Sequence, residues 1–311
     1  MAVPTTPTGV ESTIGIGEET TYGTAVAATE FYYLLEPPSI DFGRKKTLKP
    51  VMGNAFTRKA TDARREPTIS FKILVSYDEL GFLLAHAIGD SSVATSGSGP
   101  YTHTIAGASM PVGLTVEADY GAASMTGGTT PAFTGCQISK LCITQAHNDF
   151  AEVSVECTAE DVAQVTKASP TYPTDNFLEY ASLGTVEINS VAQNARSCEL
   201  TISNELRSDR FNLGSKSRVG IGRKRMTVTG KIEVEMDAMT EMNLSLNGTD
   251  TPITLTWTGA SSHSLSLALT GSNITSANPT ASGDDDWIVP VEFDADGDKL
   301  TATLINADAS Y

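Results

Sequence analysis

The strongest constraint on the fold of this chain is a pattern that occurs twice. The stretch Ala60–Gly89 matches Val219–Gly248 at a constant offset of 159 residues, in the order basic segment, alternating strand, helix. A second match, of Val153–Glu156 with Val289–Glu292, has an offset of 136, as two copies with different loop lengths would give. The matched pairs include Ile69 with Val228, Ile73 with Ile232, Asp78 with Asp237 and Gly89 with Gly248. Because the order of elements is kept, we interpret the chain as an internal duplication.

Each copy combines one helix with several short strands. Thr68–Val75 alternates apolar and polar side chains, which predicts a half-buried strand. Tyr77–Ile88 has helical spacing; Ser76 or Asp78 can cap its start, and Gly89 ends it. Further short strands are predicted at Phe31–Leu35, Ser39–Phe42, Tyr101–Ala106, Gly113–Tyr120, Gln137–Ala146 and Phe150–Thr158. The sequence therefore predicts a mainly β fold of two duplicated β-barrel or sandwich modules, each with one short flanking α-helix.

The composition of the connecting segments places the domain boundaries. Residues 1–28 are rich in Pro, Thr and Gly and are predicted to be an extended N-terminal arm, which would become ordered only against a body or a neighbour. Residues 167–176 contain two prolines and no apolar periodicity, which is typical of a linker. The predicted modules are therefore residues 29–166 and 177–311.

The basic residues of this acidic chain are concentrated in two segments. The chain has 21 Lys and Arg against 37 Asp and Glu, a net charge of −16, yet Arg44–Arg65 and Arg207–Arg225 hold 15 of those 21. The remainder has 6 basic and 35 acidic residues, a net charge of −29. Each segment precedes the strand and helix of one copy, and each is predicted to be a loop. The basic residues concerned are Arg44, Lys45, Lys46, Lys49, Arg58, Lys59, Arg64 and Arg65, and then Arg207, Arg210, Lys216, Arg218, Arg223, Lys224 and Arg225.

Three interpretations of the basic segments compete. They are solvated loops neutralised by their own acidic modules, or a nucleic-acid site, or contacts with the acidic surface of an identical neighbour. A nucleic-acid site would want aromatic residues among the basic ones, and only Phe56 and Phe211 qualify. We favour the third interpretation, because opposite patches at opposite ends of a subunit make a head-to-tail contact that closes into rings or continues as a filament.

No motif predicts catalysis, a cofactor or a metal site. There is no Gly-x-Ser-x-Gly, and Gly214–Ser217 departs from a phosphate loop because its lysine does not directly follow the glycine. Asp294–Asp298 resembles a calcium loop, but its glycine falls at the fourth position instead of the sixth, which favours an Asp-Gly turn. Whether that loop binds calcium stays open. The four cysteines, Cys136, Cys142, Cys157 and Cys198, lack ligand spacing and are expected to be buried thiols.

The ends and the hydropathy of the chain give a further expectation. The N-terminal residues have no basic start and no apolar core of signal-peptide length, and no apolar run approaches the ~18–20 residues of a membrane helix. We therefore expect a soluble protein that is made in the cytosol.

Together, several features resemble the tail tube, or major tail, proteins of long-tailed bacteriophages. They are the segment Gly15–Thr24, the basic loop before the strand at Met226–Met236, the helix after that strand, and the duplication. The resemblance covers most of residues 11–305 and is to the longer variety, in which two tube modules are joined in one chain.

The resemblance implies a fold, an assembly and partners. Six modules form a ring around a channel, so a chain with two modules would give a pseudo-hexameric ring of three copies, and the long loops would join stacked rings. It implies a virion tail protein, assembled in the host cytoplasm, that meets tape-measure, tail terminator and baseplate proteins. DNA would pass through the channel without specific binding, because a lumen of like charge offers phosphates no counterion-releasing contacts. The family has no catalytic residues to carry over.

Two other classes remain alternatives. An extracellular adhesin or pilus-like repeat of β domains would normally bring a signal peptide, and none is visible in the sequence. A tube subunit of a bacterial injection machine would follow closely related physics, but such subunits are usually single modules.

Overall fold

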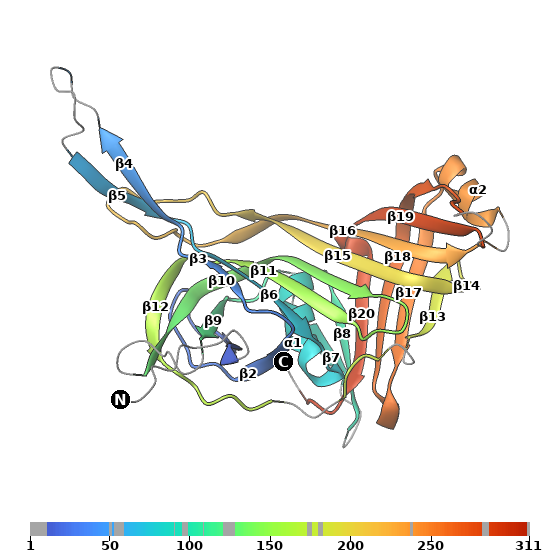
Figure 1. Ribbon diagram of the computed structural model, residues 1–311, viewed down its shortest axis with the longest axis horizontal. Coiled ribbons are helices and arrows are strands. Elements are labelled where there is room, and N and C mark those ends of the chain that lie inside the picture. The colour runs from blue at the N-terminus through green and yellow to red at the C-terminus, as the bar shows by residue number, and fades with distance from the viewer. Residues whose placement is uncertain are drawn as a thin grey trace, which may run out of the picture.

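The fold is mainly β, with two α-helices and one closed six-stranded barrel (Figure 1). The computed structural model describes residues 11–49, 52, 59–89, 91–94, 99–107, 109–120, 128–172, 176–179, 183–236, 239–281 and 286–309. The first half contains β1 (Thr13–Glu18), β2 (Glu30–Leu34), β3 (Ser39–Asp41), β4 (Arg44–Lys49), β5 (Lys59–Arg65), β6 (Thr68–Leu74), α1 (Tyr77–Ile88), β7 (Ser91–Ala94), β8 (Tyr101–Ala106), β9 (Leu114–Asp119), β10 (Thr129–Gln145), β11 (Glu152–Thr158) and β12 (Asp161–Thr166). The second contains β13 (Leu183–Ile188), β14 (Val191–Gln193), β15 (Ala195–Arg207), β16 (Gly222–Glu235), α2 (Thr240–Asn247), β17 (Thr251–Thr258), β18 (Ser264–Ala277), β19 (Ile288–Asp296) and β20 (Leu300–Asn306), with single-turn 3₁₀ helices at Ala260–Ser262 and Gly297–Lys299.

The barrel lies in the first half. It closes through the antiparallel pairs β1–β9, β9–β10, β10–β11, β11–β6, β6–β2 and β2–β1. The segment expected to be an extended arm therefore supplies a barrel strand over its described part, because Ile14 and Ile16 bury their side chains completely between β2 and β9. A Gly-rich stretch with only two apolar side chains can form a barrel strand when the strands on both sides hydrogen-bond to its backbone.

One sheet runs through both halves. Its eight strands lie in the order β3, β6, β11, β10, β15, β16, β19 and the C-terminal part of β18, and the pair β10–β15 joins the halves. The long strands β10 and β18 each leave this sheet and continue into a second one. Each half has its own second sheet. Its strand order is β1, β9, β10, β12 in the first half and β13, β17, β18, β20 in the second half.

The hairpin β7–β8 crosses between the halves. It follows α1, but β8 pairs with β20 over residues 101–106 and so extends the second sheet of the C-terminal half. Its four-residue first strand, β7, is not among the strands predicted from the sequence. The C-terminal half has no counterpart, because only Gly248, Thr249 and Asp250 separate α2 from β17.

The inward face of the eight-stranded sheet contributes a large part of the core. One transverse row of paired residues crosses seven strands and is apolar throughout: Ile73, Val153, Ile143, Leu200, Gly230, Phe293 and Ile274. Gly230 is needed in this row because a Cβ there would lie 2.3 Å from Cζ of Phe293, whose ring covers it. The four cysteines are buried free thiols, as predicted.

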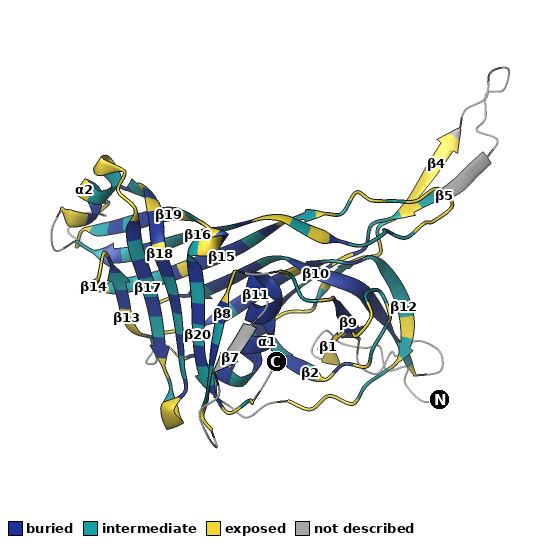
Figure 2. Ribbon diagram, turned by 180° about the vertical axis from the view of Figure 1, so that it is seen from behind, coloured by how far each residue is buried: buried dark blue, intermediate teal, exposed yellow. Residues whose placement is uncertain are grey.

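The two helices differ in burial. In α1 every residue except Asp78 is buried, and the helix packs against β10, β15, β20 and β8. In α2 only Glu241 is buried, and the helix packs on β18 (Figure 2). Two apolar side chains are largely uncovered: Met239, at the N-cap of α2, is 60% exposed, and Leu246 in α2 is 81% exposed.

Candidate assembly surfaces

The first basic segment is a β-hairpin that projects from the body. The predicted loop pairs with itself as β4 and β5, and the pair extends beyond the sheets (Figures 1 and 2). Its base depends on Gly43, which has φ +58° and approaches the backbone of Glu66 so closely that a Cβ would lie 2.1 Å from it. The described side chains of β4 are all exposed, and Leu48 is the one apolar side chain among them, so this part of the strand covers no core of its own.

The described side chains of the hairpin are exposed and mostly basic. Lys45 and Arg64 both form ion pairs with Glu66, the latter at 2.7 Å. The hydrogen bond from Lys45 lowers the pKa of the Glu66 carboxyl. Apolar side chains accompany the charges: Leu48 is 61% exposed and Met52 is fully exposed. Large apolar side chains beside cations at a projecting tip favour contact with another protein.

The second basic segment lies against the base of this hairpin. The backbone N–H of Arg65 donates to the carbonyl of Lys216 at 2.8 Å, and the Arg64 guanidinium lies 5.3 Å from the ring centre of Phe211. Asp161, at the start of β12, accepts from Arg65 at 3.2 Å and from the Ser217 hydroxyl. The two segments, far apart in sequence, therefore form one basic region, which we call the basic arm.

Two of the predicted contact residues are held inside the protein. Arg218 is 5% exposed and donates to the carbonyl of Ala159 at 2.7 Å. Arg223 is half-buried and donates to the carbonyl of Ile88, at the end of α1, at 2.7 Å. Burial lowers the pKa of both guanidinium groups. These two side chains join the halves of one chain, which sequence alone did not indicate.

The other predicted contact residues divide into two groups. Exposed or half-exposed in the structure are Arg44, Lys45, Lys46, Arg64, Arg65, Arg207, Arg210, Lys216, Lys224 and Arg225. Outside the described part of the chain lie Arg58 and the side chains of Lys49 and Lys59. The exposed group is the surface available to a neighbour.

A second surface is the outward face of the eight-stranded sheet, which we call the polar face. Three transverse rows define it: Ser70, Glu156, Lys140, Ser203, Thr227 and Asp296; Lys72, Ser154, Cys142, Thr201, Thr229, Asp294 and Asn273; and Leu74, Glu152, Thr144, Glu199, Lys231, Glu292 and Ser276. Apart from Leu74 and Cys142, these rows consist of hydroxyl, amide and charged side chains, and no aromatic side chain occurs among them. Sequence reasoning did not find this face, although the polar positions of the alternating strands carried its signal.

The polar face has excess negative charge. Its rows contain six carboxylates and three lysines, a net of 3 − 6 = −3. Two of the lysines are paired, Lys72 with Glu152 at 2.5 Å and Lys231 with Glu233 at 2.8 Å. The hydrogen bond from Lys72 to Glu152 raises the pKa of that ammonium group. The face therefore offers polyanions little attraction.

Among the described residues, no group of three or more His, Cys, Asp or Glu side chains is arranged to hold a metal ion. The predicted Asp-Gly turn is a 3₁₀ turn at Gly297–Lys299 that joins β19 to β20. In the part of the chain that the structure describes, no helix is long and apolar enough to cross a membrane.

Comparison with known proteins agrees with a barrel protein that presents assembly surfaces. A family model for phage tail tube protein matches residues 9–295 of the 311. The chain belongs to the phage tail tube protein family. No curated protein matches it. As a member of this family it is a structural subunit that self-assembles in the tail of the virion.

Proposed function

We propose that three copies of this tail tube protein form a ring, that rings stack through the basic arm, and that the polar face lines a channel for DNA. In this proposal the channel also holds a tape-measure protein during assembly in the host cytoplasm. The ends of the tube meet the terminator and baseplate proteins.

The junction β10–β15 carries the proposal. It continues one sheet from the first half into the second, and both halves have the same strand order on either side of it. Within the described residues, β3 pairs only with β6, and the C-terminal part of β18 only with β19. Unpaired edges invite another strand. An edge contact β18–β3 between copies would repeat the β10–β15 junction, and three copies of eight strands would give a barrel of 24.

The strand order also supports the duplication. The structural counterparts are β6 and β16, β11 and β19, and β10 and β18, each in the same place in its half. Ile73 pairs with Val153, and its counterpart Ile232 pairs with Val291, so the offset for these last strands is 138. The value of 136 suggested by the sequence is two residues short. The hairpin β7–β8 accounts for the difference from 159.

The charges support separate roles for the two surfaces. The polar face is net negative and rich in Ser and Thr, so a DNA duplex would find repulsion and few counterion-releasing contacts there. The basic arm leaves the body beyond the end of the sheet, where an acidic surface of the next ring would meet it (Figure 1). Complementary charge of this kind chiefly sets register and rate of association.

Electron microscopy and native mass spectrometry of the purified protein test the proposal. We expect hollow tubes with three copies in each layer. The variant Lys45→Glu/Lys46→Glu should fold and form rings but not stack, because both side chains are exposed on the hairpin. The control variant Lys140→Glu/Lys299→Glu reverses two lysines outside the basic arm and should stack like the wild type. Long tubes from the hairpin variant would contradict the stacking role, and a wild type that stays monomeric would contradict the assembly.

A further inference from the structure

The two helices occupy equivalent positions but have unequal environments. At the offset of 159, Leu80 corresponds to Met239 and Ala87 to Leu246. Leu80 and Ala87 are completely buried, whereas Met239 and Leu246 are 60% and 81% exposed. The same apolar positions are covered at α1 and open at α2, which indicates that α2 lacks a neighbour in the single chain.

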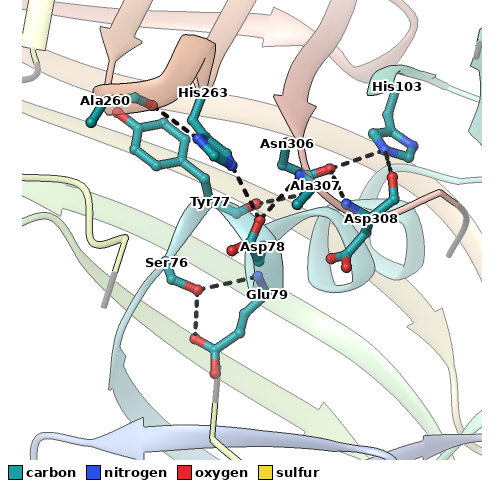
Figure 3. Close-up of polar contacts among 10 residues, drawn as sticks. All are labelled: Ser76, Tyr77, Asp78, Glu79, His103, Ala260, His263, Asn306, Ala307 and Asp308. Atoms are coloured by element: carbon teal, nitrogen blue, oxygen red, sulfur yellow. Dashed lines mark hydrogen bonds and ion pairs between the residues drawn. The ribbon is translucent and has the colours of Figure 1, made fainter. Parts of the chain in front are cut away.

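Part of the cover of α1 comes from the second half of the same chain, through β15 and β20. At the start of the helix, the Asn306 side chain on β20 donates to the carbonyl of Tyr77 at 2.9 Å (Figure 3). At the end of the helix, the Asn204 side chain on β15 donates to the carbonyl of Ala87 at 2.8 Å. Each end of α1 is therefore held by the half that follows it around the proposed ring.

No half follows α2 within the chain. Among the described residues α2 packs mainly on β18, which is the counterpart of the β10 strand beneath α1. A large apolar side chain, Trp287, is 56% exposed. Its backbone carbonyl accepts from the N–H of Met236 at 3.0 Å, which places it near the segment that leads into α2. The first half of the next copy is the body that would stand where the second half stands for α1.

The pairing registers identify which residue of that next copy meets the end of α2. Strand β3 flanks β6 as β15 flanks β16. The corresponding pairs are Ile40 with Ile69, and Ile202 with Val228. Because Ile69 and Val228 are equivalent, Ile40 is equivalent to Ile202. Two residues further along the chain, Phe42, which directly follows the end of β3, is equivalent to Asn204 on β15.

Phe42 has the exposure and the support that a contact of this kind needs. It is 48% exposed, and its ring stacks on the buried Phe133 with 5.9 Å between centroids. We propose that Leu246 of one copy packs against Phe42 of the next, where Ala87 and Asn204 meet within the chain. An apolar pair thus replaces the hydrogen-bonded pair at the seam between copies. The inference rests on the proposed ring and names its closing contact.

Substitution of Leu246 tests the contact. Leu246→Asp should reduce the yield of rings and tubes by roughly tenfold or more, because a charge would be buried at the seam. Its melting temperature should match the wild type, since the side chain is exposed in the single chain. Thr258→Asp, at the far end of β17 from α2, adds the same charge outside the seam and should assemble normally. Unchanged tubes from Leu246→Asp would overturn the contact and leave the proposed function standing.

A cysteine pair gives a direct readout. In tubes of Phe42→Cys/Leu246→Cys, mild oxidation should link copies into dimers and trimers on a non-reducing gel, with no larger species if each ring holds three copies. The native cysteines are buried and at most 9% exposed. The control Phe42→Cys/Leu213→Cys places the second thiol on the basic arm, at a position more exposed than Leu246, and should give no ladder. Failure of the first variant to cross-link within intact tubes would refute the contact. A wild type without rings would instead refute the proposed function, and the contact with it.

Discussion

Replacing Glu79 with Gln should stabilise the protein at alkaline pH. Glu79 lies in the first turn of α1 and is 3% exposed. One carboxyl oxygen accepts from the Ser76 hydroxyl at 3.2 Å, and the other has no hydrogen-bond partner among the described residues (Figure 3). Burial is the main cause that raises the pKa of this carboxyl to about 8; the nearby carboxylates of Glu30 and Asp78 act in the same direction, and the hydrogen bonds with Ser76 oppose them.

The size of the effect follows from the pKa. A difference of about 3.5 between the folded value and the ordinary 4.5 corresponds to about 5 kcal/mol, at about 1.4 kcal/mol for each unit. Between pH 4.5 and 8 the folded chain binds a proton that the unfolded chain has lost, so stability falls as the pH rises through this window. A glutamine has no charge to bury. The stability difference between variant and wild type should therefore grow from near zero at pH 4.5 to about 5 kcal/mol above pH 8.

Urea denaturation of both proteins at several pH values between 4.5 and 9 measures this difference directly. Effects of the other titratable groups cancel when the two curves are subtracted. Glu292→Gln, which removes a carboxylate from the exposed polar face, serves as the control and should follow the wild-type profile. Parallel profiles for Glu79→Gln and the wild type would show that the buried carboxyl does not keep its proton to alkaline pH.

Two further substitutions probe the interior. Gly230→Ala should destabilise the protein by roughly 2–4 kcal/mol in chemical denaturation, because the new methyl group would collide with the ring of Phe293 at 2.3 Å. A loss under 0.5 kcal/mol would mean that the ring moves freely. Arg218→Ala should cost about 2–3 kcal/mol, since the carbonyl of Ala159 would lose its buried donor. The exposed Lys216→Ala should cost less than about 1 kcal/mol, and equal losses from both substitutions would contradict this assignment.

Local signals predicted local structure well. Helix α1 has the predicted bounds, the Ser76 hydroxyl accepts from the N–H of Glu79 as an N-cap, and Gly89 closes the C-terminus. Strand β6 buries alternate residues as its pattern indicates. In both segments the deciding information, periodicity and caps, lies within a dozen neighbouring residues.

Pairing between strands that are distant in the chain could not be predicted from the sequence. The start of β10, from Thr129 to Cys136, is rich in Thr, Gly and Pro and was not predicted as a strand, yet β9 and β12 hold it on both sides. Strand β12 was not predicted either. The basic hairpin was expected to be a loop because nothing in its composition says that β4 faces β5. Partners supplied by the fold, more than local propensity, made these strands.

The candidate surfaces were predicted in part. Charge clustering found the basic arm, but not that Arg218 and Arg223 serve the interior, since burial depends on what the fold brings against them. The acidic residues gave no basis for choosing among them until the strand registers put Glu199 and Glu292 on one face. Leu246 aligns with Ala87 at the offset of 159, but only the structure shows that Leu246 is exposed where Ala87 is buried.

The hairpin β7–β8 makes the proposed ring mechanically uneven. Within a chain, the contact between the halves is reinforced by the β8–β20 strand pair and by the covalent linker. Between α2 and β17 there is no hairpin like β7–β8 that could pair with the next molecule in the same way. A hoop of three chains would alternate strong and weak joints. Under radial load from cargo inside, it would part at three places instead of six, and each fragment released would be a whole chain.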